Sequence, residues 1–149
     1  MKKVLLLAAI FGMLCSPSQA KTWWTYEASC TVTDVQPTPG LPFETAGYTI
    51  RIAFDAKNPT KINNLQICPN ADQTNFADVL SRNYSKVKYW KDGKDIIWTG
   101  EPKFQNHPVI EKGTLHFSGD NSATYVVEIF DRGEKDSTIY SVCRVSQAE

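Results

Sequence analysis

Apolar and polar residues alternate along much of the chain, which is the pattern of β-strands that bury one face. The clearest alternation lies in 114–118, 123–130 and 138–145, where β-branched and aromatic residues dominate and turn-forming residues separate the segments. In the last segment one face carries Ile139, Ser141, Cys143 and Val145. We expect these antiparallel strands to be the unit against which the rest of the chain packs.

Five further strands are expected at 23–35, 48–56, 62–68, 85–89 and 95–99. The last two flank Asp92-Gly93, a strong signal for a tight hairpin turn. This signal leaves the register of the hairpin open. A two-residue loop places Val87 opposite Trp98, whereas a three-residue loop places Lys88 there. The sequence therefore does not decide whether Trp90 or Trp98 is exposed.

One helix is expected, at about residues 71–83, where Phe76, Val79 and Leu80 form a single apolar stripe. The following segment 100–112 contains Pro102 and Pro108 and is interpreted as a connection. Short strands with one helix predict a mainly β fold, either an antiparallel β-sandwich or an incomplete barrel.

The first twenty residues have the pattern of a secretory signal peptide. Lys2 and Lys3 precede an apolar run, and Ser18 and Ala20 are the small residues expected before cleavage at Lys21. Residues 21–149 would then be a single exported domain, periplasmic or extracellular. We expect no membrane span after cleavage, because the apolar run is too short and no second one follows.

Net charge gives little reason to expect a nucleic-acid partner. The chain has 16 basic and 16 acidic residues, and loss of Lys2 and Lys3 leaves a net charge of −2. Nucleic-acid binding usually requires a clustered basic face, which this mixture of signs does not provide.

Three cysteines remain after cleavage, and export to an oxidising compartment favours a disulfide between two of them. The preferred pair is Cys68–Cys143, because Cys68 ends an apolar strand just before a turn at Pro69. The alternative pair is Cys30–Cys143, and sequence alone cannot decide between them. If Cys30 is left over, it is expected to be a buried thiol within the first strand.

Candidate catalytic chemistry is sparse. The chain has two histidines, His107 and His116, and none of the common zinc, nucleophile-elbow, redox or phosphate-loop motifs. No metal or cofactor is expected. One enzymatic alternative remains, a small hydrolase that uses His116 with acidic neighbours or with the thiol of Cys30.

Exposed aromatic rings are the better clue, because such rings stack on sugars or anchor protein interfaces. The candidate binding residues are Trp23, Trp90 and Trp98. We therefore favour a non-enzymatic exported binding protein with a protein or glycan partner. One alternative is a glycan-binding module that uses exposed aromatics. Another is an inhibitor of a lysozyme-like or other hydrolase, by likeness in size, export and disulfide use to small periplasmic β-proteins of that kind.

Overall fold

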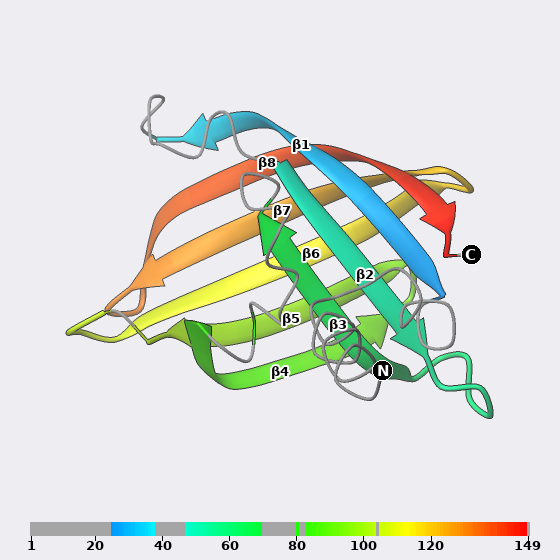
Figure 1. The fold of residues 1–149 in the computed structure, drawn as a ribbon. Coiled ribbons are helices and arrows are strands. Elements are labelled where there is room, and N and C mark those ends of the chain that lie inside the picture. Colours follow the sequence, from blue (N-terminus) through cyan, green and yellow to red (C-terminus); the bar gives the residue numbers. More distant parts are fainter. Residues whose placement is uncertain (1–24, 38–46, 70–79, 81–82, 104, 149) are drawn as a thin grey trace, which may run out of the picture.

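The computed structural model describes residues 25–37, 47–69, 80, 83–103 and 105–148 of the 149-residue chain. These residues form one antiparallel sheet of eight strands, which curls into a nearly closed barrel (Figure 1). The strands are β1 Tyr26–Gln36, β2 Gly47–Phe54, β3 Ile62–Pro69, β4 Tyr84–Asp92, β5 Asp95–Pro102, β6 Val109–Gly119, β7 Ser122–Asp131 and β8 Glu134–Gln147. The expected mainly β fold is confirmed, in its barrel form.

Strand order explains the near closure of the barrel. Neighbours in sequence pair with one another, except β3 and β4, and β8 returns to pair with β1, which gives the order β3-β2-β1-β8-β7-β6-β5-β4. The two edge strands, β3 and β4, face each other across the remaining gap. The hydroxyl of Tyr89 in β4 spans this gap and donates to the carbonyl oxygen of Asn63 in β3, at 3.2 Å.

The interior is filled by the alternate apolar positions that define the strands. Burial extends across every strand except β4, and the largest side chains that are fully buried include Tyr125, Ile50, Ile52, Ile96 and Leu115. The expected inward face of β8 is confirmed, since Ile139, Ser141, Cys143 and Val145 are all buried.

The barrel has two ends with different surroundings. At the Phe117 end lie the β2–β3, β4–β5 and β6–β7 turns, together with the start of β1 and the end of β8 (Figure 1). At the Glu111 end lie the β5–β6 connection, the β7–β8 turn and the starts of β2 and β4. The 100–112 segment is not one long connection, because β5 continues to Pro102 and β6 already begins at Val109.

The disulfide joins Cys30 to Cys143, so the preferred pairing of Cys68 with Cys143 is wrong and the alternative is confirmed. The reason is the closure of the barrel, which places β1 beside β8 with Cys30 directly opposite Cys143. Cys68 is buried in β3, which two strands separate from β8, and it is not part of this bond. Cys30 is therefore not the buried thiol that was expected.

The register of the β4–β5 hairpin differs from both of the expected alternatives. Its turn consists of Gly93 and Lys94, with Asp92 paired to Asp95, and Gly93 takes a positive φ of 56°. The shift places Tyr89, rather than Val87 or Lys88, opposite Trp98. Trp98 consequently faces the interior, and Trp90 faces outward.

Two expectations fall largely on residues that the structure does not describe. The signal peptide at 1–20 lies wholly outside the described residues, as does most of the helix expected at 71–83. Leu80, from the apolar stripe of that helix, is described and packs into the core. Within the described part of the chain, no helix is long and apolar enough to cross a membrane.

Candidate functional site

A cavity of about 610 Å³ opens at the Phe117 end of the barrel. Three half-buried aromatic side chains line it, namely Tyr26 from β1, Phe54 from β2 and Phe117 from β6. The Tyr26 ring centre lies 6.0 Å from that of Phe54 in an edge-to-face arrangement, and 5.9 Å from that of Phe117. The three rings therefore form one aromatic cluster, with part of its surface exposed to the cavity.

Strand alternation explains why these rings meet. Each occupies the last inward-facing position of its strand at this end of the barrel, with buried residues such as Ala28, Ile52 and Leu115 at the preceding inward positions. An inward residue at a strand end has core on one side and solvent on the other. A large ring at such a position remains half-buried, which is the exposure that ligand contacts require.

Polar groups surround the aromatic cluster and complete the lining of the cavity. Lys91 and Lys94 bring positive charge and Asp120 brings negative charge, while Asn121 and Gln147 offer amide groups. The Lys91 ammonium donates to the carbonyl oxygen of Gly93 at 2.7 Å, which holds the lysine over the hairpin turn. An apolar floor with polar groups around it can orient a ligand that has both kinds of surface.

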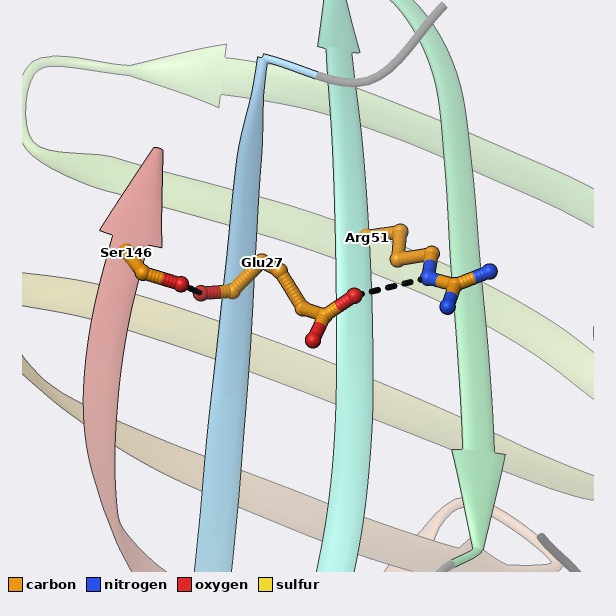
Figure 2. Close-up of polar contacts among 3 residues, drawn as sticks. All are labelled: Glu27, Arg51 and Ser146. Carbon is orange, nitrogen blue, oxygen red and sulfur yellow. Dashed lines mark hydrogen bonds and ion pairs between the residues drawn. The ribbon is translucent and has the colours of Figure 1, made fainter. Parts of the chain in front are cut away.

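An ion pair lies on the outer face of the sheet, near the same end. Figure 2 shows Glu27 of β1 reaching across β2 to Arg51, whose Nε donates to Glu27 Oε2 at 2.9 Å. Ser146 of β8 makes a long contact of 3.5 Å with the backbone carbonyl oxygen of Glu27. Arg51 faces outward, but its side chain is only 10 % exposed. The ion pair links the outer faces of β1 and β2, the two strands that carry Tyr26 and Phe54.

A second hollow, of about 650 Å³, borders this ion pair and is lined mainly by polar residues of β1 and β8, including Glu27, Ser29 and Arg144. It shares Asn121 and Gln147 with the aromatic cavity, so the two hollows adjoin at the end of the barrel. A ligand larger than the aromatic cavity would meet this polar surface next.

At the Glu111 end the interior is polar. The hydroxyl of Tyr84 donates to Glu111 Oε2 at 2.7 Å, and burial raises the pKa of the Glu111 carboxyl above its ordinary value. Burial, and then the nearby Glu111 charge, raises the pKa of Tyr84 as well, and the same causes raise that of Tyr48 to about 12. These tyrosines therefore remain neutral phenols at neutral pH.

The middle of the barrel separates the two ends. The Trp98 indole N–H donates to the hydroxyl of Tyr125 at 2.9 Å, in a fully buried contact. Opposite Trp98 is Gly113, where a Cβ atom would overlap the indole ring. The glycine lets this ring lie flat against β6 and fill the interior at that level.

The three predicted binding tryptophans do not form one site. Trp23 lies outside the described residues, Trp98 is buried within the barrel at 3 % exposure, and Trp90 is 42 % exposed on the outer face of β4. Trp90 is instead the first member of a row of cross-strand neighbours on the outer face. The row crosses five strands and continues through Ile97, Thr114, Val126 and Tyr140. Trp98 is thus a core residue, and Trp90 alone remains a surface candidate among the described tryptophans.

Each histidine has an acidic neighbour. His116 Nδ1 lies 2.6 Å from Asp95 Oδ1, and His107 Nδ1 lies 2.9 Å from Asp131 Oδ1. The first pair crosses from β6 to β5 on the outer face, and the second joins the β5–β6 connection to the end of β7. The version of the hydrolase hypothesis that uses a Cys30 thiol is wrong, because Cys30 is in the disulfide. The described residues contain no group of three or more His, Cys, Asp or Glu that could hold a metal ion.

Sequence reasoning missed Phe54 and Phe117 as site residues and did not single out Glu111 at all. A usable signal was present, since an aromatic at the last inward position of a strand marks the rim of a barrel. Comparisons with protein-family models, with curated proteins and with solved structures found no match to this chain.

Proposed function

We propose that this is an exported, non-enzymatic binding protein that takes its ligand at the Phe117 end of the barrel. The observation that carries the proposal is the 610 Å³ cavity with Tyr26, Phe54 and Phe117 half-buried along its wall. Its volume is within the range of about 300–1,000 Å³ that is usual for small-ligand sites. The Cys30–Cys143 disulfide is compatible with an oxidising compartment outside the cytoplasm.

The lining favours a glycan over a purely apolar ligand. Sugar rings present apolar C–H faces to aromatic side chains, and their hydroxyl groups need amide, carboxylate and ammonium partners around the edge. The cavity offers three rings for the first purpose and Lys94, Asp120, Asn121 and Gln147 for the second. The adjoining polar hollow beside Glu27 gives room for a further sugar unit.

Binding is favoured over hydrolysis because the His116–Asp95 pair lies on the outer face of β6 and β5, with His116 51 % and Asp95 36 % exposed. A catalytic base acts in a cleft that excludes water and holds the substrate. The alternative that the protein inhibits a hydrolase stays a prediction, since no contact described here tests it.

A glycan array probed with the purified, oxidised protein tests the proposal, followed by isothermal titration calorimetry with the best glycan. We expect Phe117→Ala and Phe54→Ala each to weaken binding about tenfold or more, the usual loss for one stacked ring. Trp90→Ala is the matched control, because it removes an exposed ring from the outer face and should leave binding unchanged.

Absence of binding to every glycan on the array would refute the glycan proposal. Loss of binding in Trp90→Ala, with Phe117→Ala behaving as the wild type, would move the site to the outer face of β4.

A further inference from the structure

Glu111 is an acidic residue at an inward-facing position of a β-strand. On β6 the other inward positions hold Val109, Gly113 and Leu115, which are buried, and Phe117 at the far end. A carboxylate in this series weakens the folded state when it ionises, because burial disfavours its charged form. A residue that carries such a cost at an interior position is a candidate for function.

Among the described residues, one oxygen of the carboxylate has a hydrogen-bond partner and the other has none. Tyr84 donates its hydroxyl hydrogen to Oε2, and among the described residues no lysine, arginine or histidine forms an ion pair with Glu111. A carboxylate can accept about four hydrogen bonds, so the Tyr84 bond leaves most of its capacity unused. Glu111 and Tyr84 are both half-buried, so part of each side chain remains exposed.

A group of aromatic rings extends from the partner of this carboxylate, Tyr84. The Tyr84 ring packs edge-to-face on Trp98, with centres 5.3 Å apart, and the Tyr48 ring packs in the same way on Tyr125 at 5.4 Å. The Trp98 indole also donates to the Tyr125 hydroxyl, so a continuous series of contacts runs from Glu111 through Tyr84, Trp98 and Tyr125 to Tyr48. Ring faces attract cations, and a carboxylate among such rings is the arrangement that recognises an ammonium group.

The interior next to this cluster holds a second polar atom that lacks a partner. Ser141 lies opposite Tyr125 in the β7–β8 register and is 2 % exposed, and its hydroxyl oxygen makes no hydrogen bond. Buried hydroxyl groups normally have a partner, so this oxygen keeps its capacity to form a hydrogen bond.

We propose that Glu111, with the rings of Tyr48 and Tyr84, binds the ammonium group of a small organic amine within the Glu111 end of the barrel. The ammonium donates to the free carboxylate oxygen, and the ring faces cover its remaining charge. A bare metal ion fits less well, because calcium takes six to eight oxygen ligands and magnesium about six, and this cluster supplies one carboxylate. The proposal does not depend on the glycan proposal, which concerns the other end of the barrel.

Isothermal titration calorimetry at pH 7 with two cations and their uncharged counterparts tests this inference. The pairs are phenethylamine with 2-phenylethanol, and choline with 3,3-dimethyl-1-butanol. We expect at least one cation to bind, with its uncharged counterpart at least tenfold weaker. Because Trp98 packs on Tyr84, its fluorescence should also change when that cation binds.

Substitutions locate the site. Glu111→Gln keeps an acceptor for Tyr84 but removes the charge, and should weaken binding of the cation at least tenfold. Glu101→Gln is the matched control, since Glu101 lies near the same end but pairs with Lys86 on the outside of the barrel, and it should bind as the wild type does. Circular dichroism shows whether each variant is folded.

The inference is overturned if neither cation binds at millimolar concentration, or if the uncharged counterparts bind equally well. It is also overturned if folded Glu111→Gln keeps the wild-type affinity. The first two outcomes need only the wild-type protein, so the test holds even if a variant fails to fold. Loss of glycan binding in Phe117→Ala with amine binding retained would show that the two ends act separately.

Discussion

The two ends of the barrel are built from the same strands but differ in chemistry. At the Phe117 end, the rings of Tyr26 in β1, Phe54 in β2 and Phe117 in β6 pack together without a buried charge. At the Glu111 end, the same β6 carries a carboxylate hydrogen-bonded to a tyrosine of β4. Apolar rings at a rim extend the core and stabilise it, whereas a half-buried carboxylate weakens it. The comparison predicts that substitutions at the two ends change stability in opposite directions.

The disulfide crosslinks β1 and β8, two strands that run between the two ends of the barrel. Its removal should have the largest effect on stability. It joins the first and last strands across a sequence separation of 113 residues. The chain-entropy model therefore predicts that Cys30→Ala with Cys143→Ala lowers the free energy of unfolding by about 5 kcal/mol. Urea denaturation followed by circular dichroism measures this change.

The control for the disulfide is the next cross-strand pair of β1 and β8, Thr31 with Val142, both exposed. Replacing both by alanine should cost less than about 1 kcal/mol, as is usual for surface positions. Equal losses in the two double variants would mean that the crosslink itself contributes little.

Gly113→Ala should have the next largest effect, because it disturbs the buried layer between the two ends. The new methyl group would overlap the Trp98 indole, which cannot move without breaking its bond to Tyr125. Overpacking of this kind typically costs about 1–3 kcal/mol, and we expect the upper part of that range. Urea denaturation measures the loss.

Gly93→Asn is the matched glycine control. Gly93 has a positive φ, but no atom lies within 4 Å of the position its Cβ would take, and asparagine tolerates that backbone conformation. A loss of less than about 0.5 kcal/mol is expected there. If Gly113→Ala were as mild as this control, Trp98 would not be held against β6.

The alternation of residues was enough to predict where most strands lie and the inward face of β8, because it is a local property of the chain. The disulfide partner was not predictable in the same way. Whether Cys30 or Cys68 is opposite Cys143 depends on which strand pairs with β8, and that pairing joins the two ends of the chain. The hairpin register failed for a similar reason, since a turn at Gly93-Lys94 differs from one at Asp92-Gly93 by only one residue.

The candidate sites were less predictable than the fold. Tryptophan was expected to mark the binding surface, but Trp98 is the residue that fills the middle of the barrel. Glu111 lay in a stretch with two prolines that was interpreted as a connection, so its inward direction could not be inferred. The position of a side chain along the barrel axis depends on the stagger between strands, which no single strand encodes.

Phe117→Ala tests the apolar end and should be destabilising. The ring is half-buried and packs on Tyr26, so its loss removes apolar contacts without leaving a closed cavity. We expect a decrease of about 2 kcal/mol in the free energy of unfolding, below the 3–5 kcal/mol that is typical of a fully buried phenylalanine. Val142→Ala, at a residue 54 % exposed on the outer face, should change it by less than about 0.5 kcal/mol. A stable Phe117→Ala variant would mean that the aromatic cluster does not support the barrel.

Glu111→Gln tests the polar end and should be stabilising at pH 7, by about 1 kcal/mol, a typical size for one substitution. Burial raises the pKa of Glu111 in the folded protein, so the folded form binds this proton more tightly than the unfolded form does. The wild type therefore loses stability as the pH rises from the ordinary carboxyl pKa through the raised one, and the loss is constant above both. Glutamine does not titrate, so the advantage of Glu111→Gln should vanish below about pH 4 and grow as the pH rises through the raised pKa of Glu111. Thermal unfolding from pH 3 to 8 measures this difference. Glu101→Gln is the control for the loss of one charge. A gain in stability that did not vary with pH would show that relief of the buried charge is not its cause.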